Sequence, residues 1–261
     1  FDAMQVASLR LTAGAVIFVI ALALRGGRGF KIAARDIPLF LGLGLGSVLF
    51  FTVCYFKSIE MMPLSIAAIL LYTSPIWVTL MSVLFFKERL TLRRVAALAL
   101  AFGGCVLVSG LGGEGLTPLG LLIGLCSGIG YGLYSILGSV ALRKYEPLTV
   151  TTYAFLFSAA GSWFICRPAE MLSIAASLPP LGFAFDVLGI AAVTAVAPYL
   201  LYTLGLKNTP ASKAAIMATI EPLVATVLGI AVFSEPLTPA AAAGILLILA
   251  AIVLLNAHGK E

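Results

Sequence analysis

The sequence predicts an all-α polytopic membrane protein made of two inverted five-helix repeats. Its composition is too apolar for a soluble domain, because 61% of the residues are hydrophobic and 10% are charged, whereas about 25% are charged in ordinary soluble domains. Apolar runs of about 20 residues, the length that spans a bilayer as a helix, recur along the chain. An internal repeat, the third observation, predicts how these helices are arranged.

Prolines and apolar runs together delimit nine helices. Pro63, Pro118, Pro147, Pro210 and Pro239 each lie at or near a predicted first turn, where a missing backbone N–H costs nothing. The predicted helices cover residues 4–24, 37–57, 63–86, 92–110, 118–142, 147–166, 182–206, 210–233 and 238–256.

The stretch from Tyr55 to Thr91 matches the stretch from Tyr202 to Thr238 at a constant offset of 147 residues. The matching pairs include Tyr55/Tyr202, Pro63/Pro210, Ser65/Ser212, Pro75/Pro222, Glu88/Glu235 and Leu90/Leu237. A duplicated membrane unit is the usual plan of a secondary transporter, with the substrate site between the halves. The repeat therefore favours a transport function.

The offset also predicts the size of each repeat. The helix over 118–142 needs a partner ahead of Phe1, so we expect a further apolar span there and ten helices in the full protein. Residues 1–115 then form the first repeat without its first helix, and residues 116–261 form the second. A unit of five helices crosses the membrane an odd number of times, so the second unit enters from the opposite side to the first. The repeats are therefore expected to be inverted.

Lysines and arginines support this topology. They gather in one set of loops and leave only Lys57 and Arg167 for the opposite face. Positive charge marks the cytoplasmic side. We therefore expect a multi-pass protein of the bacterial inner (plasma) membrane with a cytoplasmic C-terminus.

Glu221 is the strongest single candidate for a functional residue. It follows Pro210 by 11 residues, which is about 16 Å along a helix and close to the bilayer midplane. A carboxylate at that depth has to face a wet cavity, be protonated or have a partner. Two interpretations remain open: Glu221 couples protons or binds a substrate ammonium group, or it only hydrogen-bonds a neighbouring helix.

Pro222 and its repeat mate Pro75 lie at matching mid-helix positions. Each removes an i→i−4 hydrogen bond, so we expect the carbonyls of Ala218 and Leu71 to be free. Because the pair recurs in register, we interpret the two prolines as symmetric kinks that shape a central cavity and a hinge. The alternative is that helix prolines are simply common in membranes.

Aromatic and hydroxyl side chains extend the predicted cavity. The candidate lining residues are Tyr72, Ser74, Tyr131, Tyr134 and Tyr199. Tyr131 and Tyr134 share one face of the helix over 118–142, for which interhelical hydrogen bonding is the alternative interpretation. Another face of that helix has glycine at every fourth residue from Gly120 to Gly132. This pattern predicts close packing, within one chain or between copies.

The other charged residues indicate neither catalysis nor nucleic-acid binding. Arg10, two turns into the first helix, either snorkels outward or binds an anionic group or an acidic partner. The sequence has one histidine and no metalloprotease, serine-hydrolase or phosphate-loop motif. Its basic residues form no tract suited to nucleic acid. We therefore expect no enzyme, no metal and no cofactor.

Several segments resemble the EamA-type branch of the drug/metabolite transporter superfamily. They are Pro63-Leu-Ser-Ile-Ala-Ala through Tyr72-Thr-Ser-Pro75, Lys87-Glu88-Arg-Leu-Thr91, Glu221-Pro222 and Ser234-Glu235-Pro-Leu-Thr238. The resemblance implies ten helices in two inverted repeats around a central cavity, and export or exchange of small metabolites, commonly amino acids and related compounds. Glu221-Pro222 matches a pair frequent in the second repeat of such proteins. Ser74 stands at the matching position of the first, so we expect a cavity with asymmetric charge.

We therefore predict a transporter that moves a small organic solute across the lipid bilayer by alternating access, with Glu221 as the candidate for proton coupling. Two other classes stay open. A lipid-linked carrier flippase shares this architecture and needs basic groups near its site. The second class is a non-transporting membrane scaffold, because a repeat shows that the two halves share an ancestor and does not show that the protein transports a solute.

Overall fold

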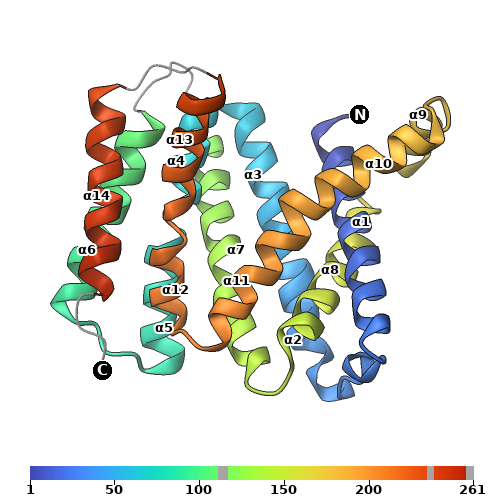
Figure 1. Ribbon diagram of the computed structural model, residues 1–261, viewed down its shortest axis with the longest axis horizontal. Helices are drawn as coiled ribbons and strands as arrows, with labels where there is room; N and C mark the ends of the chain where they lie inside the picture. Colours follow the sequence, from blue (N-terminus) through green and yellow to red (C-terminus); the bar gives the residue numbers. More distant parts are fainter. Residues whose placement is uncertain (111–116, 234–237, 257–261) are drawn as a thin grey trace. The chain divides into compact units, whose positions relative to one another are not determined.

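The protein is built of helices, several of which follow one another end to end and together form segments of membrane-spanning length (Figure 1). The computed structural model describes residues 1–110, 117–233 and 238–256, and within them every regular element is a helix. Seven helical segments of this part of the chain are long and apolar enough to cross a membrane. The predicted all-α polytopic fold is confirmed. Glu235 and Leu237 of the repeat lie outside the described residues.

The helices follow the predicted spans closely. In chain order they are α1 (Ala3–Leu24), η1 (Arg28–Phe30), η2 (Ala34–Asp36), α2 (Ile37–Leu41), η3 (Gly42–Leu49), α3 (Phe50–Met61), α4 (Leu64–Leu71), α5 (Ser74–Phe86), α6 (Leu92–Ser109), α7 (Pro118–Leu142), α8 (Pro147–Ser162), α9 (Pro168–Ala176), α10 (Pro180–Ala191), η4 (Ala192–Val196), α11 (Ala197–Lys207), α12 (Ala211–Met217), α13 (Ile220–Phe233) and α14 (Pro239–Asn256). Segments η3 and η4 are π-helical.

The region after α8 differs from the prediction. The helix expected to reach residue 166 ends at Ser162, because the chain tightens into a turn in which the Phe164 N–H donates to the Gly161 carbonyl at 3.2 Å. Helix α9 then occupies a stretch predicted as loop. Pro168 at its first position and Glu170 in its first turn are ordinary helix-start signals, and they account for this helix.

The 147-residue repeat recurs in the bounds of the helices. Shifting Leu92–Ser109 (α6) by the offset gives Pro239–Asn256, the bounds of α14. The interruption between α4 and α5 has a counterpart between α12 and α13. The π-helical η3 maps onto the stretch that contains the π-helical η4. Irregular backbone is therefore duplicated along with the sequence.

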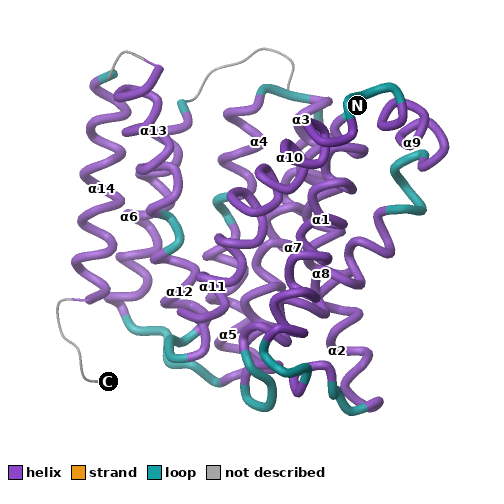
Figure 2. The backbone as a smooth tube through the Cα atoms, turned by 45° about the vertical axis from the view of Figure 1, so that its right-hand side comes forward, coloured by secondary structure: helices purple, strands orange, loops and turns teal. Residues whose placement is uncertain are grey.

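Repeat-related helices run antiparallel. Helices α6 and α14 lie side by side (Figures 1 and 2). Arg93 near the start of α6 donates to the Leu254 carbonyl near the end of α14, whereas Gly104 near the end of α6 meets Gly244 near the start of α14. Contacts that run in opposite directions along two equivalent helices show that the repeats are inverted.

The chain folds into two compact units that cut across the sequence halves. Unit 1 comprises Phe1–Phe56 and Leu137–Asn208, and unit 2 comprises Lys57–Ile136 and Thr209–Glu261. Each unit therefore contains parts from both halves of the chain. These units are not the two sequence repeats. The division into repeats over 1–115 and 116–261 stays a prediction.

In unit 1, α1 packs against α8. These two helices correspond to each other at the 147-residue offset, and they also run antiparallel. Ser8 bonds Ser162 at 2.7 Å at one end of the pair, and the rings of Phe18 and Phe155 meet edge to face at 5.0 Å further along. Gly14 of α1 and its mate Gly161 of α8 are both points of close approach: a side chain at either would come within 2.9 Å of a neighbouring side chain.

Candidate functional site

Unit 2 contains two interrupted helices at equivalent positions. The first break, Tyr72–Thr73, separates α4 from α5, and the second break, Ala218–Thr219, separates α12 from α13. Each break is followed within a few residues by a proline, Pro75 or Pro222. The positions predicted as kinks thus lie in the first turn of a new helical segment, and their role as hinges stays a prediction.

One expectation about these breaks is wrong. The Ala218 carbonyl is not free, because the Glu221 N–H donates to it at 3.0 Å. This i→i−3 bond tightens the turn and replaces the donor that Pro222 lacks. Although Pro222 has no N–H to donate, the Ala218 carbonyl accepts a hydrogen bond from Glu221, the residue before the proline.

The first break is held by side chains. The Thr73 hydroxyl donates to the Leu70 carbonyl at 2.6 Å and accepts a hydrogen bond from the Trp77 indole N–H at 3.1 Å. Thr73, Ser74 and Pro75 are all buried. A buried, hydrogen-bonded turn of this kind keeps a fixed geometry.

The glycines of α7 pack against this first break. A side chain at Gly128 would come within 2.6 Å of the Thr73 Oγ1 and 2.7 Å of the Leu70 carbonyl, so glycine is required there. Gly124 and Gly132 meet Leu70 and Val78 in the same way. The predicted packing role of this glycine face is confirmed, and the packing occurs within one chain.

The second break carries Glu221. This side chain is exposed, in contrast to the buried Ser74 at the matching position. Met217, Ile220 and Val224 are exposed on the same side of the helix. Among the residues that the structure describes, Glu221 has no hydrogen-bond or ion-pair partner on its carboxylate. Across the helix pair, Cys105 of α6 lies within electrostatic range of Glu221. An accessible, unpartnered carboxylate beside a helix break is the chemistry expected where a cation or a proton binds.

The other predicted lining residues are divided between the two units. Tyr72 and Tyr131 are half-buried in unit 2, and Tyr134 of the same unit is buried, with 4% of its surface exposed. Tyr199 belongs to unit 1, where its ring meets Phe155 edge to face at 5.0 Å. Unit 2 thus holds Glu221, Tyr72, Ser74, Tyr131 and Tyr134, while Tyr199 and Arg10 belong to unit 1.

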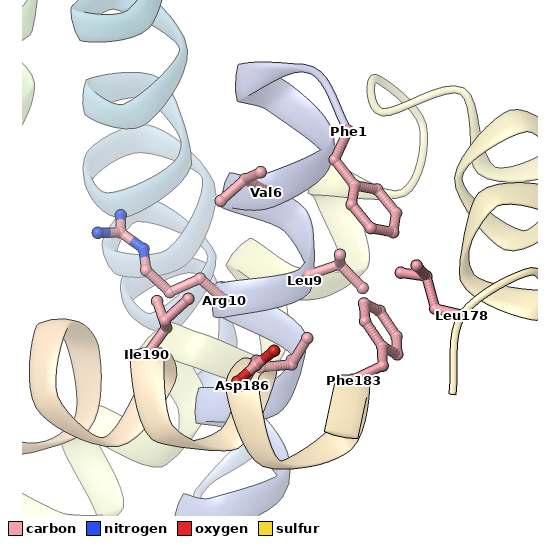
Figure 3. A pocket seen from close by; sticks show the side chains of 9 residues that line it. Phe1, Val6, Leu9, Arg10, Leu178, Phe183, Asp186 and Ile190 are labelled. Carbon is pink, nitrogen blue, oxygen red and sulfur yellow. The ribbon is translucent and has the colours of Figure 1, made fainter. Parts of the chain in front are cut away.

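Arg10 lines a cleft of unit 1 between α1 and α10, with a volume of about 270 Å³ (Figure 3). Asp186 of α10 lines the same cleft, but the Arg10 guanidinium points away from it and the two form no ion pair among the described residues. The Arg10 Nε is buried and unpartnered within that part of the chain. Sequence reasoning missed Asp186, although a single acid in the apolar stretch 180–206 was a visible signal.

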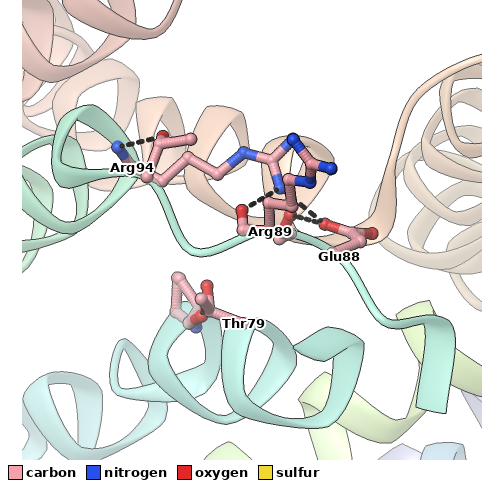
Figure 4. A network of polar contacts seen from close by, with 7 residues as sticks. Thr79, Glu88, Arg89 and Arg94 are labelled. Atoms are coloured by element: carbon pink, nitrogen blue, oxygen red, sulfur yellow. Dashed lines mark hydrogen bonds and ion pairs between the residues drawn. The ribbon is translucent and has the colours of Figure 1, made fainter. Parts of the chain in front are cut away.

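One end of unit 2 carries Lys87, Arg89, Arg93 and Arg94 and is here called the arginine-rich end. A network of hydrogen bonds and an ion pair lies there (Figure 4). The Glu88 carboxylate accepts a hydrogen bond from Arg94 at 3.0 Å and a short one from Ser212 of α12. Arg94 also donates to the Arg89 carbonyl at 3.2 Å. The network therefore links the α5–α6 loop, α6 and α12.

Unit 1 has a comparable network in its loops. Lys144 forms an ion pair with Asp36, which also accepts a hydrogen bond from Tyr145, and Lys207 bonds Glu146 at 2.9 Å. The hydrogen bond to Asp36 raises the pKa of Lys144. In the described part of the chain no cluster of three or more His, Cys, Asp or Glu side chains could hold a metal ion.

Comparison with known proteins relates this arrangement to membrane transporters. The sequence matches the EamA-like transporter family over residues 1–110 and 118–257. An uncharacterized transporter of Archaeoglobus fulgidus is 31% identical over 218 residues, covering 81% of this chain and 74% of the relative. A second transporter of that organism is 25% identical over 92% of this chain and 83% of its own length.

A more distant relative is also named as a transporter, and a solved structure shares the fold. A probable terminal-alkyne amino-acid exporter of Streptantibioticus cattleyicolor is 26% identical over 60% of this chain and 51% of its own length. One solved crystal structure superimposes with a TM-score of 0.80 over 97% of this chain and 87% of its own, at 19% identity. The fold, the duplicated family match and the transporter relatives all support one conclusion: this chain is a membrane transporter and belongs to the EamA-like transporter family.

Proposed function

We propose that this protein is a secondary transporter of the bacterial inner membrane that exports or exchanges a small organic metabolite by alternating access. Glu221 is its protonatable or cation-contacting group. The observation that carries the proposal is the exposed, unpartnered Glu221 carboxylate beside the second break of unit 2. A carboxylate is retained at membrane depth chiefly where it contacts a solute, an ion or a proton.

Two further observations support this assignment. Inverted repeats with interrupted helices are the architecture in which alternating access occurs, with the solute bound where the helices are broken. Lysines and arginines gather in one set of loops, which supports a cytoplasmic C-terminus. The amino-acid exporter among the relatives makes amino acids and their amine derivatives the first solutes to test.

Flux through reconstituted protein tests the proposal. Purified protein in liposomes is loaded with radiolabelled amino acids, amines or nucleosides, and the release of each is compared with release from protein-free liposomes. We expect saturable release of at least one solute. If every solute leaks at the protein-free rate while the protein remains folded, transport of these classes is ruled out and a scaffold role is favoured.

A further inference from the structure

The cleft between α1 and α10 of unit 1 is lined by two charged side chains of opposite sign, Arg10 and Asp186 (Figure 3). The other residues that line it are apolar and include Phe183 and Val187 of α10. An apolar wall with a few polar groups is the usual composition of a small-molecule site, and sites for drug-sized ligands have volumes of about 300–1,000 Å³. At about 270 Å³, this cleft suits a ligand smaller than that.

Neither charged side chain has a partner among the residues that the structure describes. The Arg10 Nε is buried without a hydrogen bond, and the exposed Asp186 carboxylate forms neither a hydrogen bond nor an ion pair within that part of the chain. The Arg10 guanidinium points away from Asp186, so the two charges do not neutralise each other (Figure 3). A buried donor without an acceptor destabilises the folded protein, so a ligand that supplies the acceptor gains binding free energy here.

The two charged residues lie at a similar depth. Arg10 follows Ala3, the first residue of α1, by seven residues, and Asp186 follows Pro180, the first residue of α10, by six. These spacings correspond to about 10 Å and about 9 Å along a helix. Both helices belong to segments that are long and apolar enough to cross a membrane. Ionisable side chains inside such segments usually mark the path of a solute or an ion.

From this cleft we propose a second solute site, in unit 1, for a small zwitterion with an apolar side chain. The carboxylate of the ligand accepts hydrogen bonds from Arg10, its ammonium group donates to Asp186, and its apolar part lies against Phe183 and Val187. The predicted topology places the start of α1 on the outer side of the membrane, so the site faces that side. Its use in transport rests on the proposed function, whereas binding to it does not.

Three ligands that differ by one charged group test the site. Phenylalanine carries both charges, 2-phenylethylamine lacks the carboxylate, and 3-phenylpropionate lacks the ammonium group. Binding is measured by calorimetric titration of the Glu221→Gln protein in phosphatidylcholine nanodiscs, so that the carboxylate of unit 2 does not contribute. We expect phenylalanine to bind about tenfold more tightly than either analogue, because each analogue loses one charge-assisted hydrogen bond.

Two further substitutions in this Glu221→Gln parent assign the charges to residues. Arg10→Gln should abolish the preference for phenylalanine over 2-phenylethylamine and keep its preference over 3-phenylpropionate. Asp186→Asn should have the opposite effect, and its exposed position makes it the safer variant for folding. Such a crossed pattern isolates each contact from general effects on stability.

Arg167→Gln is the matched control. Arg167 pairs with Glu170 at 3.8 Å on the surface of the same unit, away from the cleft lining. This substitution removes the same charge as Arg10→Gln, so it should leave the Kd values of all three ligands unchanged.

The proposed site is contradicted if phenylalanine does not bind the parent protein, or if the three ligands bind it equally well. It is also contradicted if both preferences survive in Arg10→Gln and in Asp186→Asn. Loss of phenylalanine binding when the nanodiscs contain phosphatidylethanolamine, a zwitterionic lipid, would show that lipid occupies the cleft instead. None of these results depends on solute flux, so failure of the liposome assay removes the transport function separately from this site.

Discussion

At the scale of single residues, glycine determines where the helices of this protein touch. Gly104 and Gly244 bring the backbones of α6 and α14 together, and a side chain at Gly104 would come within 2.7 Å of the Gly244 carbonyl. Backbone atoms cannot move aside as a flexible side chain can. Small residues are the usual means by which membrane helices approach closely, since lipid offers no hydrophobic drive for their association.

Two neighbouring glycines of α6 provide a matched test. Gly104→Ala should lower the free energy of unfolding by about 2 kcal/mol, because overpacking against a fixed backbone strains the pair. Gly103 has open space around it, so Gly103→Ala should stabilise the helix by about 0.5 kcal/mol. Thermal or denaturant unfolding in detergent measures both. Equal effects of the two substitutions would contradict the close contact between α6 and α14.

Some of these residues could be predicted from the sequence and others could not. The glycines of α7 recur every four residues, so their packing role was predicted. Gly14, Gly161 and Gly104 belong to no such four-residue pattern, and only the three-dimensional contacts show that they are close-approach points. The depth of Glu221 followed from residue counting along a helix, whereas its exposure depends on neighbours that the sequence does not place.

At the scale of helices, the two breaks of unit 2 are equivalent in position and different in construction. The first is buried and held by Thr73, Trp77 and the Gly128 contact. The second has an exposed Ile220 and an exposed Glu221 in place of Thr73 and Ser74. The second break is also held by a buried threonine, because the Thr219 hydroxyl donates to the Ile216 carbonyl at 2.6 Å as Thr73 does to the Leu70 carbonyl. The first break has the hydrogen bond from the Trp77 indole in addition.

This difference predicts unequal effects of removing the prolines. Pro75→Ala should leave solute flux near the wild-type rate, because the Trp77–Thr73 hydrogen bond and the Gly128 contact maintain the first break without it. Pro222→Ala restores a backbone donor at the second break, which should straighten the helix and lower flux about tenfold. Liposome flux of the best solute measures both, and equal loss in the two variants would contradict the asymmetry.

Most helical spans could be predicted from apolar runs and prolines, but their internal irregularities could not. The π-helical η3 and η4 insert extra residues into a turn, and neither contains a proline, although Pro198 follows η4 in the first turn of α11. The end of α8 at Ser162 falls inside an apolar run, where composition does not change. Apolar composition sets which segments enter the membrane, while tertiary contacts set where each helix bends or ends.

At the scale of the whole molecule, inversion of the repeats is the property that supports alternating access. Antiparallel packing of α6 on α14 and of α1 on α8 demonstrates it within each unit. Inverted repeats offer two alternative conformations related by the pseudo-twofold axis, which is the structural basis of alternating access.

The predicted orientation has a direct test in intact cells. Lys87→Cys and Arg167→Cys place exposed thiols in loops assigned to opposite faces. A membrane-impermeant maleimide should label Arg167→Cys in intact cells and Lys87→Cys only in inverted vesicles, because positive charge marks the cytoplasmic side. Labelling of both positions from the same side would exclude the proposed topology.

The central claim is that the carboxylate beside the second break contacts the transported solute or its coupling proton. The most direct measurement is flux of the best solute through liposomes with and without an imposed pH gradient, for wild type and Glu221→Gln. Glu60→Gln serves as control, since Glu60 pairs with Lys57 on the surface of α3. We predict that Glu60→Gln behaves as wild type and that Glu221→Gln loses about tenfold in flux together with its response to the gradient. Gradient-sensitive flux at the wild-type rate in Glu221→Gln would contradict the account.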